Sequence, residues 1–223
     1  MIDGVRLKVC GLTSLVDAEL ADRVGADYLG FILHPSSPRY LSLLAYRSMH
    51  LRLPTGRKRV AVMVEPSDEQ LEAAQQEDFD RFQLHFRSDT PLETLARWSE
   101  RVMPSRLWLA PRLAPGEPFR PEWLPLAGTF LIDTYRPDGF GGSGRVGDWP
   151  RFAELQRAYP DHTWVLAGGL NPGNIADALT ESRARAVDVN SGVEASPGLK
   201  DHAKMKSFVV ALHRARTAPP PKT

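Results

Sequence analysis

The chain is short of cysteine, of net charge and of long apolar runs, and each shortage excludes a class of protein. Cys10 is the only cysteine among 223 residues, so an internal disulfide is excluded, which fits a reducing compartment. The 28 basic and 27 acidic residues leave a formal charge of +1, which gives no reason to expect nucleic acid or an anionic membrane as a partner. No apolar run reaches the roughly 18 residues of a membrane span, and the N-terminus lacks the pattern of a signal peptide. We therefore expect a cytoplasmic protein.

Short aliphatic runs recur along the chain and alternate with helix-like stretches. Most of the runs are flanked by turn residues, as buried parallel strands are. The predicted strands cover residues 7–10, 28–33, 59–64, 81–85, 106–110, 129–133, 163–167 and 186–189. The predicted helices cover residues 14–24, 41–51, 67–76, 90–101, 149–159, 172–180 and 200–214.

Eight strands that alternate with about seven helices predict an α/β fold, a closed (β/α)8 TIM barrel. An open doubly wound sheet is the alternative. Because no linker or composition shift divides the chain, residues 1–215 are expected to form one domain, and the proline-rich residues 216–223 a flexible tail. Thr90, Pro91 and Glu93 match a capping box with proline at the first helical position. The proline-rich segment 111–125 lacks a helical pattern.

Three side chains with useful chemistry fall where predicted strands end. In a barrel of this kind the chemistry lies at the C-terminal ends of the strands. Cys10 ends the first predicted strand, His85 the fourth and Asp133 the sixth. They are therefore expected to face one mouth. Taken alone, Cys10 fits two readings, a catalytic base or a small buried apolar residue.

Glycine-rich loops follow the last two predicted strands. Gly168 and Gly169 come directly after the seventh strand, and Asn190, Ser191 and Gly192 come after the eighth. Glycines let the backbone approach a ligand, and exposed N–H groups attract anions, so barrels commonly bind phosphate here. The alternative is that the glycines only make tight turns. The pattern predicts a phosphorylated small-molecule substrate.

Motifs spread over nearly the whole chain resemble those of the phosphoribosylanthranilate isomerases of tryptophan biosynthesis. No single motif is decisive, but their joint occurrence in this order is highly specific. The matching segments are KVCGLT (8–13), GADYLGF (25–31), SSPRY (36–40), QLH (83–85), LIDT (131–134), GFGGSG (139–144), DW (148–149), GGLNP (168–172), VDVNSGVE (187–194), PG (197–198) and KD (200–201).

The resemblance implies an Amadori rearrangement of N-(5′-phosphoribosyl)anthranilate to 1-(2-carboxyphenylamino)-1-deoxyribulose 5′-phosphate. The resemblance implies that Asp133 is the general acid, that Cys10 is the general base and that Arg39 binds the anthranilate carboxylate. It implies no metal or cofactor. The sister isomerase of histidine biosynthesis is an alternative, but those enzymes carry aspartate where Cys10 stands. A phosphate-binding barrel without catalysis is a second alternative.

Each assigned role makes a physical demand. Asp133 must be protonated when it acts, which needs a pKa raised by burial or by nearby negative charge. Cys10 must supply a thiolate, so positive charge is expected to lower its pKa. Lys8 points to the same face of the strand as Cys10 and either supplies that charge or pairs with Asp188. His85 is an alternative base or a structural hydrogen-bonding residue.

The sequence departs from the family pattern at three positions. Phe86 replaces the usual glycine after His85, and because its bulk excludes glycine-only backbone angles we expect a reshaped loop there. Ser143 replaces a threonine and keeps the hydroxyl, and Asn190 stands where serine is common. A monomer is expected, although some family members dimerise through loops.

Overall fold

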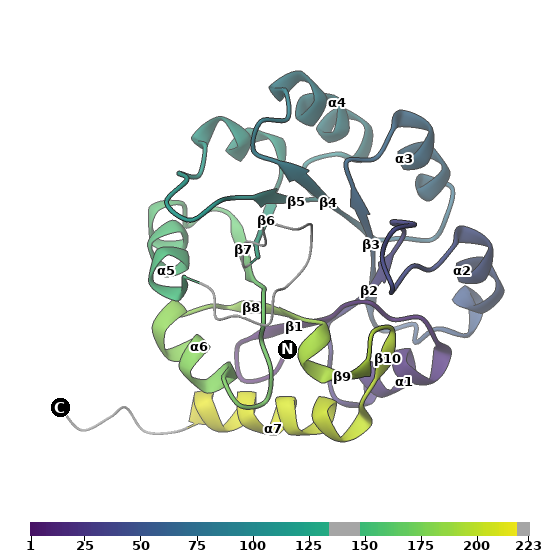
Figure 1. The fold of residues 1–223 in the computed structure, drawn as a ribbon, viewed down its shortest axis with the longest axis vertical. Coiled ribbons are helices and arrows are strands. Elements are labelled where there is room, and N and C mark those ends of the chain that lie inside the picture. The colour runs from purple at the N-terminus through teal and green to yellow at the C-terminus, as the bar shows by residue number, and fades with distance from the viewer. Residues whose placement is uncertain (134–147, 218–223) are drawn as a thin grey trace.

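The computed structural model describes residues 1–133 and 148–217, and its eight parallel strands close into a ring (Figure 1). Strands pair in sequence order, and β1 pairs with β8 to complete the ring, with Arg6 opposite Ala186 and Val9 opposite Val189. This confirms the TIM barrel over the open sheet. The strands are β1 (Arg6–Val9), β2 (Tyr28–Ile32), β3 (Lys58–Val64), β4 (Arg81–Arg87), β5 (Leu107–Arg112), β6 (Thr129–Ile132), β7 (Thr163–Leu166) and β8 (Ala186–Val189).

Helices surround the ring of strands (Figure 1). They are α1 (Leu15–Arg23), α2 (Leu43–Met49), α3 (Asp68–Gln75), α4 (Leu92–Val102), α5 (Trp149–Ala158), α6 (Ile175–Ser182) and α7 (His202–Thr217). Three 3-10 segments, η1 (His50–Arg52), η2 (Pro121–Leu126) and η3 (Ser191–Val193), and a hairpin of β9 (Glu194–Ser196) and β10 (Leu199–Lys200) complete the described elements. The segment after β5 holds only η2. Within the described ranges no helix is long and apolar enough to cross a membrane.

Helix caps and ends follow the sequence in part. Ser67 caps α3 in a capping box with Gln70. The capping box expected at Thr90 is wrong, because Pro91 occupies the cap position of α4 and the Thr90 hydroxyl instead donates to Glu65. Helix α7 continues to Thr217, so the first two residues of the expected tail are helical. The rest of that tail and the glycine-rich segment 139–144 lie outside the described residues.

Side chains on the strands divide between two packing regions. Those that face outward join the large core beneath the helices. Those that face inward form two smaller clusters, one of Trp108, Leu131, Val165 and their neighbours, and one around Cys10. These two clusters pack the interior of the barrel.

Phe86 lies within β4 and not in the loop that follows it. It stays extended and pairs with Pro111, so β4 runs on to Arg87, and His85 lies within the strand instead of at its end. The Phe86 ring is fully buried and meets Trp98 and Trp123 edge-on, with ring centroids 6.4 and 5.3 Å apart. The loop therefore begins two residues later than the sequence pattern predicts.

Replacing Phe86 by alanine is expected to lower the free energy of unfolding by about 3 kcal/mol, because it leaves a cavity between two tryptophan rings. Denaturant unfolding followed by tryptophan fluorescence measures the loss. Leu92→Ala is the control, since Leu92 is 39% exposed on α4. An equal effect in both variants would contradict a buried aromatic contact.

Candidate active site

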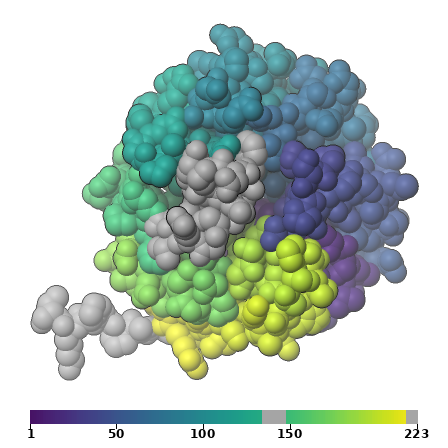
Figure 2. Space-filling view, in the orientation of Figure 1, coloured from purple at the N-terminus to yellow at the C-terminus, as the bar shows by residue number. Residues whose placement is uncertain are grey.

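A cavity of about 420 Å³ opens at the C-terminal ends of the strands. Its size suits a small ligand. It is lined by the predicted site residues Cys10, Arg39, His85, Asp133, Gly168, Gly169, Asn190 and Ser191. Figure 2 shows the loop after β2 (dark blue) beside the loops after β8 (yellow-green) on this face. The predicted residues thus meet in one space, although they are up to 181 positions apart in the chain.

Gly192 is the predicted site residue that does not line the cavity. A Cβ atom there would lie 1.9 Å from the Leu170 carbonyl oxygen. No side chain fits at that distance, so glycine is required to bring the loops after β7 and β8 together. Gly168 and Gly169 adopt φ of +90° and +64°, the left-handed region that favours glycine.

Several backbone N–H groups of the loops after β7 and β8 have no hydrogen-bond acceptor among the described residues. Within the described residues, nothing accepts a hydrogen bond from the N–H groups of Gly168, Gly169, Ser191 or Gly192. Such donors suit an anion. Helix α6 was expected to begin at Pro172, but it begins at Ile175. The side chains of Asn171 and Asn174 accept hydrogen bonds from backbone N–H groups in a turn that precedes the helix.

Cys10 lies beside a buried ion pair. The Lys8 ammonium donates to Asp188 Oδ2 at 2.9 Å, which confirms that Lys8 pairs with Asp188 inside the barrel. Gly30 on β2 makes room for both side chains, since a Cβ there would lie 3.0 Å from Lys8 Cε and 3.1 Å from Cys10 Sγ. The lysine therefore both pairs with an acid and adjoins the thiol.

The expectation that positive charge lowers the pKa of Cys10 is wrong for this state of the protein. Burial raises the pKa of the thiol, and the opposing effect of Lys8 is smaller. Burial also disfavours the Lys8 cation, but Asp188 and Cys10 outweigh it and raise the pKa of Lys8. The resting state is therefore a neutral thiol next to a fixed ammonium group.

The thiolate of Cys10 is expected to appear only above the ordinary pKa of a free thiol. Since Cys10 is the only cysteine, ultraviolet absorbance near 240 nm reports it without ambiguity after subtraction of a Cys10→Ser spectrum. Lys8→Met is expected to move the titration to still higher pH, because the cation that opposes burial is lost. A titration midpoint near neutral pH in the wild type would mean that Lys8 affects the pKa of Cys10 more than burial does, and would contradict this prediction.

His85 fits a structural role better than that of a base. Burial and the nearby Lys8 cation lower its pKa to about 3, so the imidazole is neutral and weakly basic. The Gln83 amide lies 2.7 Å from His85 Nε2, so a hydrogen bond to the neighbouring strand residue holds the ring in place.

Two buried acceptor oxygens lie on the cavity wall, one on Gln83 and the other on Asp188. Gln83 Oε1 and Asp188 Oδ1 are buried and have no hydrogen-bond partner among the described residues, and both residues line the cavity. Buried acceptors without partners are costly, so they mark where donors of a ligand fit. Both residues stand in segments that match the family pattern, QLH (83–85) and VDVNSGVE (187–194), but nothing in the sequence indicates that these oxygens lack partners.

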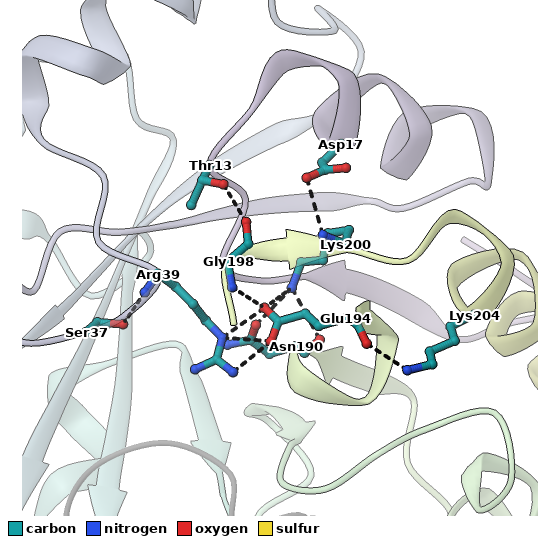
Figure 3. A network of polar contacts seen from close by, with 9 residues as sticks. All are labelled: Thr13, Asp17, Ser37, Arg39, Asn190, Glu194, Gly198, Lys200 and Lys204. Atoms are coloured by element: carbon teal, nitrogen blue, oxygen red, sulfur yellow. Dashed lines mark hydrogen bonds and ion pairs between the residues drawn. The ribbon is translucent and has the colours of Figure 1, made fainter. Parts of the chain in front are cut away.

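Arg39 makes a contact that the sequence did not indicate. Its guanidinium group is held by the carboxylate of Glu194, which is also paired with Lys200 at 3.0 Å (Figure 3). Glu194 and Lys200 lie in the matched motifs, but 155 positions separate Arg39 from Glu194, so spacing alone does not pair them.

Comparison with known proteins places the chain among isomerases. The family model described as N-(5′phosphoribosyl)anthranilate (PRA) isomerase matches residues 7–211. The N-(5′-phosphoribosyl)anthranilate isomerase of Zymomonas mobilis is 35% identical over 212 residues, which cover 93% of this chain and 98% of that protein.

Solved structures agree with the sequence comparison. Phosphoribosyl anthranilate isomerase of Thermotoga maritima is 35% identical, with a TM-score of 0.76 over 93% of this chain and 98% of its own. A phosphoribosyl anthranilate isomerase in complex with reduced 1-(o-carboxyphenylamino)-1-deoxyribulose 5-phosphate is 33% identical, with a TM-score of 0.72 and the same coverage. The match of sequence, barrel and site loops over almost the whole length means that this chain belongs to the N-(5′-phosphoribosyl)anthranilate isomerase family.

Proposed function

We propose that the protein converts N-(5′-phosphoribosyl)anthranilate to 1-(2-carboxyphenylamino)-1-deoxyribulose 5′-phosphate, with Asp133 as general acid and Cys10 as general base. The observation that carries this proposal is that both residues line one cavity together with Arg39 and the two glycine loops. The substrate has two anionic groups, and the cavity has an arginine and several N–H groups without an acceptor among the described residues to receive them.

The reaction needs two proton transfers at neighbouring ribose atoms. Asp133 gives its proton to the ring oxygen, and the C1′–O bond breaks to leave an iminium ion. The fraction of Cys10 that has lost its proton, stabilised by the Lys8 ammonium group, then removes the C2′ proton and becomes the thiol. The C2′–H electron pair forms the C1′=C2′ double bond, and the electron pair of the iminium bond returns to nitrogen, which gives an enolamine. Tautomerisation gives the ketone. Strands β1 and β6 are separated in the ring by β7 and β8, so the two side chains approach the sugar from different directions, which suits an acid and a base that act on neighbouring atoms.

The remaining groups of the cavity suit the rest of the substrate. The N–H groups of the loops after β7 and β8 are placed to bind the phosphate. The orphaned oxygens Gln83 Oε1 and Asp188 Oδ1 accept hydrogen bonds from ribose hydroxyl groups, which removes the cost of leaving them unpaired. Lys8 stabilises the thiolate once it forms.

Turnover of the purified protein tests the proposal. Loss of N-(5′-phosphoribosyl)anthranilate is expected, together with growth of a tryptophan auxotroph that lacks this isomerase. The aminoaldose substrate of the sister histidine isomerase serves as the control and is expected to remain unchanged. Tight binding of the product without turnover or growth would instead indicate a non-catalytic phosphate-binding barrel.

We also propose that the protein acts as a monomer in the cytoplasm. Each catalytic group of the proposal comes from a single chain, so the reaction does not need a second copy.

A further inference from the structure

The Arg39 guanidinium group is bound along one edge only. Arg39 Nε donates to Glu194 Oε1 at 2.9 Å, and Arg39 Nη2 donates to Glu194 Oε2 at 2.7 Å. The carboxylate thus covers the Nε–Nη2 edge. Among the described residues nothing accepts from Nη1, so the Nη1–Nη2 edge keeps a pair of donors for a second planar carboxylate.

Glu194 lies behind Arg39, away from the ligand space. Arg39 lines the cavity, but Glu194 and Lys200 do not. The Glu194 side chain is 4% exposed and that of Lys200 is fully buried, whereas Arg39 is 19% exposed. A buried carboxylate therefore holds the arginine from the protein side and leaves its other edge toward the cavity.

Lys200 fixes the carboxylate in turn. Its ammonium group donates to Glu194 Oε1 at 3.0 Å and to Asn190 Oδ1 at 2.9 Å (Figure 3). Gly198 N–H adds a longer bond of 3.4 Å to the same Glu194 oxygen. The hairpin of β9 and β10 thereby connects the arginine on the loop after β2 to Asn190 at the end of β8.

The charges of this cluster do not cancel. Arg39 and Lys200 carry two positive charges, and Glu194 carries one negative charge. Burial disfavours the Glu194 carboxylate, but Arg39 and Lys200 outweigh it and lower its pKa, so Glu194 stays ionised. Burial lowers the pKa of Lys200, which lies behind the arginine, whereas Arg39 lines the cavity. The positive charge presented to a ligand is therefore that of Arg39, which favours an anionic group there.

We infer that Glu194, fixed by Lys200, is a positioning residue that orients Arg39 so that its free edge receives the carboxylate of the anthranilate ring. The inference rests on the proposed substrate. Without the Glu194 carboxylate the long Arg39 side chain has many rotamers. The entropy lost in fixing one of them would then weaken ligand binding. Glu194 therefore acts on affinity for the carboxylated ligand, and the proton transfers at the sugar do not depend on it.

A pair of ligands tests the inference. The first is the reduced product analogue that carries the ring carboxylate, and the second is the same phosphorylated amino sugar made from aniline, which lacks it. Calorimetry on Glu194→Gln is expected to show about tenfold weaker binding of the first ligand and unchanged binding of the second. In turnover, KM is expected to rise about tenfold while kcat stays within about threefold.

The matched control is Glu77→Gln. Glu77 is also paired with an arginine, Arg47, but it precedes β4 and so lies at the opposite end of the barrel. The Glu77→Gln variant is expected to bind both ligands with the affinity of the wild type. If Glu194→Gln fails to fold, Glu194→Asp keeps the charge with a shorter reach and is expected to show the same selective loss.

Two results would overturn the inference: unchanged binding of the carboxylated ligand, or an equal loss for both ligands, which would mean a general structural effect. The ratio of the affinities for the carboxylated and the carboxylate-free ligand, measured on the same variant, does not depend on how much of that variant is folded. Absence of turnover in the wild type would overturn the proposed function alone, since the two-ligand comparison does not need turnover.

Discussion

Replacing Cys10 by alanine is expected to reduce kcat/KM by about a thousandfold, the size of a lost general base. Cys10 is 3% exposed, and alanine fills most of the same apolar space, so the barrel is expected to remain folded. The lost function is removal of the C2′ proton. Cys10→Ser is expected to fail as well, because a serine hydroxyl is far less acidic than a thiol. Steady-state kinetics with circular dichroism as a folding check measures both.

A substrate deuterated at C2′ identifies the step that Cys10 controls. In Cys10→Ala, breaking the C–H bond becomes slower than every other step, so a large primary isotope effect on kcat/KM is expected. Binding of the reduced product analogue is expected to change little and serves as the control. Near-normal turnover would remove the assignment of Cys10 as the base.

Replacing Asp133 by asparagine is expected to cost about a thousandfold in kcat/KM, because the amide keeps the shape of the carboxyl group but has no acidic proton for the ring oxygen. Asp133 follows β6 and lines the cavity. Ring opening then becomes the slowest step, so the isotope effect of the C2′-deuterated substrate is expected to fall toward one.

The two variants are thus distinguished by the direction of the isotope effect. An isotope effect that grows in Asp133→Asn would mean that the aspartate acts at the carbon and would exchange the two roles. Retained binding of the product analogue in Asp133→Asn separates the loss of the acid from damage to the cavity.

Much of the fold followed from local patterns. Each predicted strand is present, and Ser14 and Ser67 cap their helices, because apolar runs, turn residues and caps act over a few positions. The ends of the elements were less accurate. Pro91 displaced the cap of α4, and β4 runs two residues beyond its predicted end, where Trp98 and Trp123 pack against the ring of Phe86.

The site was predictable as a set of residues but not as a set of interactions. The rule that strand ends share a mouth placed Cys10 and Asp133 together. The state of Cys10 was not predictable, since burial and the competing charges of Lys8 and Asp188 depend on the closed barrel. The pairing of Arg39 with Glu194 was missed for the same reason, because a contact across 155 positions leaves no local pattern.

The pairing of β1 with β8 also constrains how the protein folds. Lys8 lies opposite Asp188, and their ion pair joins residues 180 positions apart. A contact of such sequence separation forms late, because the entropy of closing the intervening chain must be overcome first. During synthesis the N-terminal strand waits for almost the whole chain to leave the ribosome. We therefore expect the environment of Cys10 to be completed when β8 pairs with β1 and closes the ring.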